Sequence, residues 1–104
     1  MSKVYVVQED PKKNLAPAMK FGEVVIICPY GQVSFDPSEA VELIADKLDT
    51  FSDEDYLLLV GDPTLIAICS AMTGLYTNGK FKVLKWDRQE RIYYPITLDL
   101  GFEK

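Results

Sequence analysis

The stretch that decides the fold of this chain reads Tyr56-Leu57-Leu58-Leu59-Val60. It is short, continuous and apolar, and it ends at Gly61. A strand covered on both faces of a parallel sheet has this composition, whereas a half-exposed strand alternates apolar and polar residues. We therefore expect residues 56–60 to form a strand at the centre of a sheet.

A helix is predicted directly after this strand. Asp62 can cap its N-terminus, and Pro63 suits the first helical position. Apolar residues then recur at helical spacing until Asn78-Gly79, a pair typical of a helix end. The residues expected on the buried face are Leu65, Ile68, Cys69, Met72, Leu75 and Tyr76.

The segment before the central run predicts a second helix with the same start signal. Asp36 is the expected cap and Pro37 the first helical residue. The positions expected to face the core are Val41, Ile44, Leu48 and Phe51. The opposite face is strongly acidic, so this helix should lie with one side on the sheet and the other in water.

Short apolar runs at residues 4–7, 23–28 and 81–86 predict three more strands. Residues 9–21 are rich in proline, lysine and acid, and we interpret them as a connector. Residues 92–100 alternate strictly, with Ile92 first on the apolar face, which indicates a strand with one buried side. Pro95 places that strand at an edge, because proline cannot donate to a strand ladder.

The predicted element order is β-β-α-β-α-β-β in a single α/β domain covering residues 1–104. Strand–helix–strand units join parallel strands by right-handed crossovers. The strands at 23–28, 56–60 and 81–86 should therefore be parallel, and the last strand should form an antiparallel C-terminal β-hairpin. We expect a Rossmann-like mixed sheet, preferably two-layered, although the helices could share one face or occupy both.

Composition narrows the class of protein. The chain has 104 residues, 48% of them hydrophobic, and a formal net charge of −5. No apolar run approaches the roughly 20 residues of a membrane span, and the N-terminal apolar stretch is too short for a signal peptide. We expect a cytoplasmic protein without a membrane partner, for which nucleic acid is disfavoured as the main partner by the acidic charge.

Histidine is absent and there are only two cysteines. The absence of histidine excludes Ser-His-Asp and Cys-His nucleophilic mechanisms and the usual transition-metal sites. Cys28 and Cys69 each lie in an apolar stretch, so we interpret them as buried free thiols of a reducing compartment. No cofactor is expected from these residues.

One candidate site lies where parallel strands end, because ligands of open α/β sheets gather at the carboxyl ends of the strands. Three segments are expected to converge there: Glu9-Asp10, Pro29-Tyr30-Gly31 and Gly61-Asp62-Pro63-Thr64. A ligand could meet the helix N-terminus after the central run, where phosphate or carboxylate can bind. Carboxylates from two strand ends could alternatively hold Mg²⁺. The candidate residues are Gly61, Asp62, Thr64, Glu9 and Asp10. Helix capping by Asp62 and solvated turns explain the same residues without a ligand.

A second candidate is the C-terminal hairpin, where residues 80–91 carry five bases against Asp87 and Glu90, a net charge of +3. Exposed aromatic residues among bases could grip a protein partner, stack single-stranded bases, or meet the acidic helix of another copy. The residues expected to bind are Lys80, Lys82, Lys85, Trp86, Arg88, Arg91 and Tyr93. A solubilised edge hairpin accounts for them equally, since lysines discourage edge-to-edge aggregation.

Three segments of the chain resemble small proteins encoded by tailed bacteriophages. They are Val4-Tyr5-Val6-Val7-Gln8-Glu9, Asp55-Tyr56-Leu57-Leu58-Leu59-Val60-Gly61-Asp62-Pro63 and Leu84-Lys85-Trp86-Asp87-Arg88-Gln89-Glu90. The resemblance implies a viral protein made in a bacterial host's cytoplasm. It implies no catalytic residue.

These observations favour a phage-encoded, non-enzymatic binding or assembly protein that acts through the basic, aromatic hairpin on a host or phage protein. The alternative is a small enzyme or phosphate- or nucleotide-binding domain at the strand ends, with Mg²⁺ as its ion. A homo-oligomer paired through the last strand is a third possibility, which Pro95 weakens.

Overall fold

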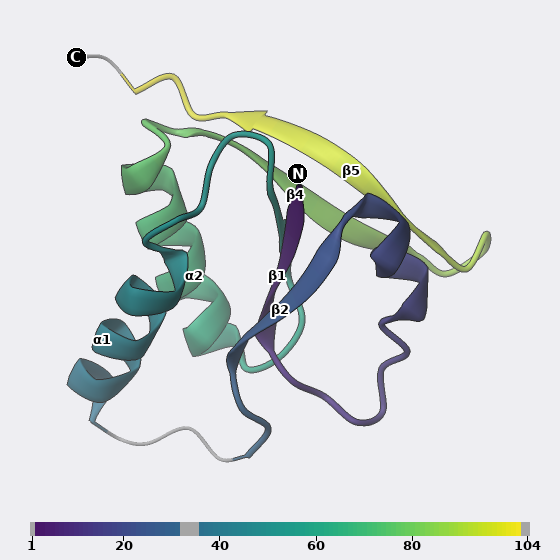
Figure 1. The fold of residues 1–104 in the computed structure, drawn as a ribbon, viewed down its shortest axis with the longest axis horizontal. Helices are drawn as coiled ribbons and strands as arrows, with labels where there is room; N and C mark the ends of the chain where they lie inside the picture. The colour runs from purple at the N-terminus through teal and green to yellow at the C-terminus, as the bar shows by residue number, and fades with distance from the viewer. Residues whose placement is uncertain (1, 32–35, 103–104) are drawn as a thin grey trace.

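The structure, a computed structural model, describes residues 2–31 and 36–102. Its five-stranded sheet has the order β2-β1-β3-β4-β5 (Figure 1). The strands are β1 Lys3–Gln8, β2 Glu23–Cys28, β3 Tyr56–Leu58, β4 Lys80–Asp87 and β5 Ile92–Asp99. The first four are parallel, and β5 is antiparallel to β4. The expected mixed α/β sheet with a C-terminal β-hairpin is confirmed, and so is the central place of β3.

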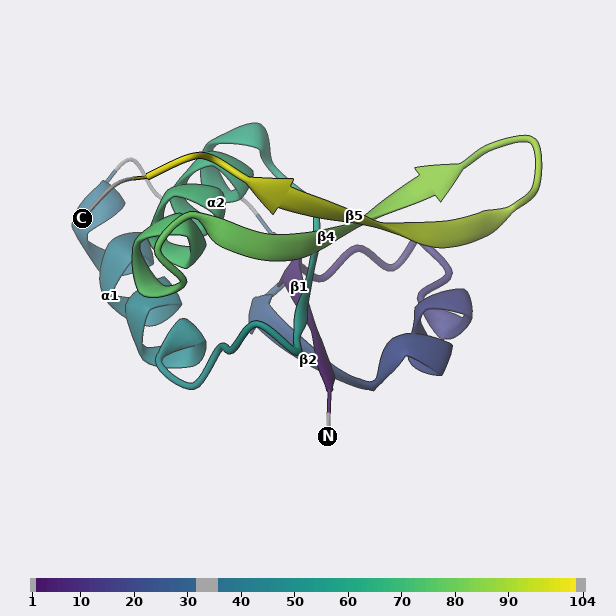
Figure 2. The same ribbon diagram turned by 90° about the horizontal axis from the view of Figure 1, so that it is seen from above.

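Two helices cover one face of the sheet and a short one covers the other. Helices α1 (Pro37–Leu48) and α2 (Pro63–Tyr76) lie together, and the 3-10 helix η1 (Ala16–Phe21) lies opposite them (Figures 1 and 2). Right-handed crossovers explain this, because the chain moves one way along the sheet from β1 to β2 and the other way afterwards. Where the sequence predicted only a connector, η1 adds cover to the second face.

The sheet separates two apolar cores, and the residues of β1 alternate between them. Tyr5 and Val7 pack on the helix side with Ile44 and Leu48 of α1. The core on the η1 side consists of Val4, Val6, Ala18, Leu58, Leu84 and Tyr93. Since β1 contributes to both cores, it is buried on both faces, as a strand of a covered parallel sheet should be.

Strand β3 is shorter than its apolar run predicted. Its ladder ends at Leu58, because Val60 turns back and donates its N–H to the Leu58 carbonyl at 3.0 Å. The Val60 carbonyl then accepts the N–H of Gln8 at 3.1 Å. Leu59 is exposed. The prediction was therefore wrong for the last two residues, which lie beside β4 without pairing with it.

The helix caps are confirmed, and the burial of three helical residues is not. Asp36 and Asp62 accept N–H groups of the first helical turns of α1 and α2. Val41, Leu75 and Tyr76 were expected in the core and are exposed. Each helix buries a stripe of residues that are spaced four positions apart. Val41 lies at the margin of the α1 stripe, and Leu75 and Tyr76 lie at the end of α2. The stripes are Ala40, Ile44 and Leu48 in α1, and Leu65, Cys69 and Thr73 in α2.

The hairpin confirms the edge position of Pro95, since β5 is the last strand of the sheet. At the start of β5, near the hairpin tip, the buried and exposed faces are the reverse of those expected: Tyr93 is only 4% exposed, whereas Ile92 is exposed. Figure 2 shows the hairpin tip reaching well beyond α2, so the helix layer does not extend over the tip. Tyr93 faces the η1 side instead and joins that core.

Both cysteines are buried free thiols, as predicted. Burial raises the pKa of the Cys69 thiol to about 12 and also raises the pKa of Cys28. Both thiols are therefore held protonated at neutral pH. Within residues 2–31 and 36–102, no helix has the length and apolar character to cross a membrane.

Candidate functional site

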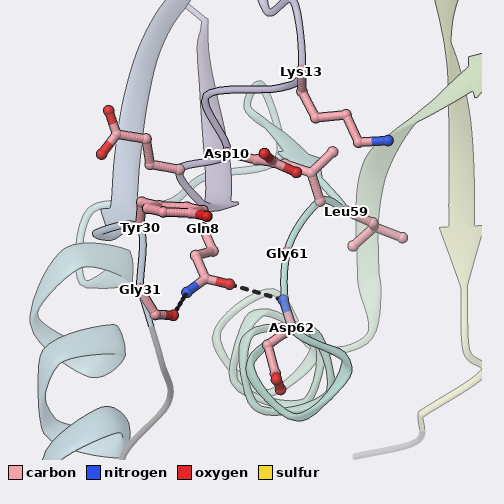
Figure 3. A pocket seen from close by; sticks show the side chains of 10 residues that line it. Gln8, Asp10, Lys13, Tyr30, Gly31, Leu59, Gly61 and Asp62 are labelled. Carbon is pink, nitrogen blue, oxygen red and sulfur yellow. Dashed lines mark hydrogen bonds between the residues drawn. The ribbon is translucent and has the colours of Figure 1, made fainter.

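The carboxyl ends of β1, β2 and β3 surround a cavity of about 540 Å³ (Figure 3). In this strand order the chain reverses its direction along the sheet between β1 and β3, which is where ligands of such sheets bind. The lining residues are Gln8, Glu9, Asp10, Lys13, Tyr30, Gly31, Leu59, Val60, Gly61 and Asp62. We call this cavity the strand-end cavity. The predicted convergence of the loops is present.

Gln8 holds the floor of the strand-end cavity together. Its side-chain Nε2 donates to the carbonyls of Pro29 and Gly31 at 3.2 and 3.0 Å. Its Oε1 accepts the N–H of Asp62 at 2.9 Å. The side chain is 7% exposed. One amide thereby joins the ends of β1, β2 and β3, and all three loops take their positions from it (Figure 3).

Gly61 is required by the same arrangement. Its φ of +118° is rarely adopted by residues with a side chain. A Cβ at this position would lie 2.4 Å from the Cβ of Gln8. The glycine therefore lets the loop after β3 pass directly over the Gln8 side chain.

Two carboxylates of the strand-end cavity accept backbone N–H groups of the residues that follow them. Asp62 accepts the N–H of Thr64 at 2.8 Å, so the α2 N-terminus is capped from within. The Asp10 carboxylate accepts the N–H of Lys12 at 2.9 Å. Thr64 does not line the cavity. Among the described residues, no group of three acidic or cysteine side chains could hold a metal ion.

The predicted hairpin residues separate into two groups. Lys82 lies near the amino end of β4, where its ammonium sits 4.2 Å from the centre of the Tyr56 ring. Lys80 lies further back, roughly 16 Å from Lys85 along the strand at about 3.3 Å per residue. The distal group is Lys85, Trp86, Arg88, Arg91 and Tyr93, and the structure does not unite it with Lys80 and Lys82.

Trp86 and Tyr93 form the aromatic centre of the distal group. They are direct partners across the β4–β5 ladder, and their ring centroids are 4.8 Å apart in an edge-on arrangement. Trp86 is 39% exposed. Tyr93, which was expected to be exposed, is buried, and burial raises its pKa. Only Trp86 of this pair therefore offers a large surface to a partner.

Two further cavities adjoin Trp86. A cavity of about 230 Å³ is lined by Lys12, Lys13, Asn14, Val60, Trp86 and Tyr93. An apolar cavity of about 420 Å³ is lined by Leu58, Leu59, Val60, Val83, Leu84, Lys85, Trp86, Tyr93, Ile96 and Leu98. Both share Val60 with the strand-end cavity. Val60 therefore borders all three cavities.

The bases around Trp86 come from the hairpin and from the connector. We call the surface that they form with Trp86 the distal hairpin surface, and it comprises Lys12, Lys13, Lys85, Trp86, Arg88 and Arg91. Lys13 lines both the strand-end cavity and the 230 Å³ cavity beside Trp86. Sequence reasoning placed the segment of Tyr30 at this end of the sheet but missed Gln8 and Lys13 as lining residues. The available signal for Gln8 was its position as the last residue of an apolar strand that feeds an acidic loop.

The family model described as Phage Pam3 gp32-like protein matches residues 2–100. No curated protein and no solved structure matches the chain.

Proposed function

The chain belongs to the family of Phage Pam3 gp32-like proteins, a family of small phage-encoded proteins, and we propose that it is a non-enzymatic binding protein whose distal hairpin surface takes a protein partner. This proposal extends the phage origin that the sequence resemblance implied. It assigns the contact to the far end of the β4–β5 hairpin.

The observation that carries the proposal is the half-exposed Trp86 between two cavities. Tryptophan and arginine dominate the energetics of protein interfaces, particularly where an aromatic ring borders a pocket. Trp86 borders both the 230 Å³ and the 420 Å³ cavity. A partner's apolar side chain could be buried against it in either cavity, with the surrounding bases as a polar rim.

Charge separates this surface from the rest of the chain. The whole chain has a net charge of −5, whereas residues 80–91 have a net charge of +3. Lys12 and Lys13 approach the hairpin from the connector and add two further bases. A local basic surface on an acidic protein attracts an acidic partner.

Affinity capture from infected cells, with the tagged protein as bait, tests the proposal. We expect the double variant Lys85→Glu/Arg88→Glu to lose a partner that the unmodified protein retains. Lys80→Glu is the matched control, because it reverses a charge at the opposite end of the same strand. Equal recovery of every partner by all three proteins would contradict the proposal.

The strand-end cavity supports a second candidate function, the binding of a small ligand. Its position at the point where the strand order reverses is the supporting observation. Its lining favours a cationic ligand over a phosphate, since Asp62 and Gln8 already occupy the N–H donors nearby. The Tyr30 ring and the lining carboxylates could hold an ammonium or guanidinium group.

A thermal-shift panel tests this second candidate with nucleotides, with and without Mg²⁺, and with alkyl diamines. Ligands that bind the native state raise the unfolding midpoint once they exceed their dissociation constant. We expect a diamine to raise the midpoint and Tyr30→Ala to remove the shift. A flat response to the amines would leave the cavity without this function.

A further inference from the structure

One stretch of β4 has a strand on only one side. β3 pairs with Lys82, Val83 and Leu84 and ends there, while β4 continues to Asp87. In the described pairing, residues 85–87 have a partner only in β5. A strand edge of this kind presents unpaired N–H and C=O groups to an incoming chain.

The two cavities beside Trp86 lie along this same open edge. Both cavities are lined by Trp86 and by Tyr93 of the η1-side core, and the 420 Å³ cavity also reaches Val83 of the helix-side core. The 230 Å³ cavity lies where Tyr93 of the η1-side core meets the connector. An added strand directs successive side chains to opposite faces. Every second side chain of an added strand therefore lies on the Trp86–Tyr93 face, which both hollows adjoin.

The other edges of the sheet lack this combination. On β5, Pro95 removes a donor at the position paired with Leu84. The outer edge of β2 carries no basic residue, and its one charged side chain is Glu23. Within the part of the chain that the structure describes, only the β4 edge combines open backbone, two hollows and a basic rim.

We propose that residues 85–87 of β4 bind an extended acidic peptide segment of the partner by strand addition. Main-chain hydrogen bonds to β4 would supply affinity, and apolar side chains in the two cavities would supply specificity. Acidic residues of the peptide on either side of those apolar residues would meet Lys12, Lys13, Lys85 and Arg88. This inference rests on the proposed function and names the chemistry of its partner.

The experiment uses synthetic peptides and the intrinsic fluorescence of Trp86, the only tryptophan of the chain. The first peptide alternates valine or isoleucine with aspartate or glutamate over eight residues, and the second replaces every acid with lysine. We expect saturable binding of the acidic peptide and at least about tenfold weaker binding of the basic one. Equal binding of both peptides would overturn the charge argument.

Backbone pairing is tested with two N-methylated forms of the acidic peptide. One carries methyl groups on the odd-numbered residues and the other on the even-numbered residues, so only one form blocks the donors that face β4. We expect one form to bind about tenfold or more weakly and the other to bind like the parent. Equal binding of both forms would rule out strand addition.

The tests of the inference and of the proposed function separate cleanly. If the peptides fail to bind while the captured partner still depends on Lys85 and Arg88, the partner uses another shape and only the inference fails. If the acidic peptide binds and no partner is captured, the edge exists as a site and the proposed function fails. Lys80→Glu again serves as the matched control for charge, and circular dichroism verifies that each variant is folded.

Discussion

The two ends of the parallel sheet are each held by one buried polar side chain, yet the two side chains act differently. At the amino end, Asp55 is 4% exposed and accepts the N–H of Lys3 and the N–H of Ser52, both at 2.8 Å. At the carboxyl end, Gln8 donates to the loop after β2 and accepts from the loop after β3. Both side chains connect β1 with β3.

The difference follows from the chemistry of the two groups. A carboxylate only accepts, so Asp55 gathers N–H groups of the segments next to it and ties a short loop tightly to the start of β1. An amide both donates and accepts, so Gln8 can lie between three loops and hold them in fixed relation. The amino end is thereby an anchor of the fold, and the carboxyl end is a frame around a cavity.

The largest loss of stability at the carboxyl end of the sheet is expected from Gly61→Ala. A Cβ would meet Gln8 and the backbone would be held at an unfavourable φ, so we expect a loss of more than about 3 kcal/mol in the free energy of unfolding. Chemical denaturation measures it. Gly31→Ala is the control, because its φ is also positive but no atom lies within 4 Å of the added Cβ. Equal losses would show that strain alone, without Gln8, sets the cost.

The two polar side chains can be compared directly by Asp55→Ala and Gln8→Ala. Asp55→Ala leaves the part-buried N–H groups of Lys3 and Ser52 without their partner, so we expect a loss of about 3 kcal/mol. Gln8→Ala exposes loop groups that water from the cavity can reach, so about 1–2 kcal/mol is expected. Denaturant midpoints at constant slope report both values. A larger loss for Gln8→Ala would make the carboxyl end the anchor.

The rates at which a thiol reagent labels the two cysteines offer a further test of the difference between the two ends of the sheet. The Cys28 carbonyl accepts the Glu9 N–H at the carboxyl end, whereas Cys69 lies within α2. With a pKa of about 12, the Cys69 thiol forms almost no thiolate at pH 8 and should resist a thiol reagent until the protein unfolds. We expect Gln8→Ala to accelerate labelling of Cys28 several-fold and to leave Cys69 unchanged. Mass spectrometry identifies the labelled site.

The raised pKa of the Cys69 thiol also makes the stability of the protein depend on pH. Because folding raises the Cys69 pKa above its unfolded value of about 8.5, the native state binds this proton more tightly. The stability that the neutral thiol contributes is complete below pH 8.5 and falls as pH rises toward 12. We expect Cys69→Ala to flatten that part of the denaturation profile, and an unchanged slope would contradict the assignment.

The smallest effect is expected at the hairpin tip, which has neither of the two polar anchors. Arg91 has a φ of +56°, a conformation that favours glycine. Arg91→Gly should therefore raise the free energy of unfolding by up to about 1 kcal/mol, and Arg88→Gly should not. Thermal melts compare the two variants. A loss of stability in Arg91→Gly would show that its side chain makes a contact worth more than the relieved strain.

The sequence predicted the elements and their neighbours better than it predicted the surface. Helix starts at Asp36 and Asp62 were predictable, because capping and the proline that follows are local chemistry. The edge place of β5 was predictable from Pro95 for the same reason. The burial of Tyr93 was not, since it depends on how far the hairpin twists past α2 and on the 3-10 helix that covers the other face.

The local pattern by itself determined the α/β class, the central strand and the meeting of three loops at the carboxyl ends. Apolar runs, caps and turn residues act over a few positions, so they can be recognised without a structure. Only the tertiary structure decided that Gln8 joins those loops, that Leu59 and Val60 leave the ladder, and that Lys12 and Lys13 approach Trp86. The contacts of Gln8 join residues 21 or more positions apart, and the packing of both sheet faces sets them.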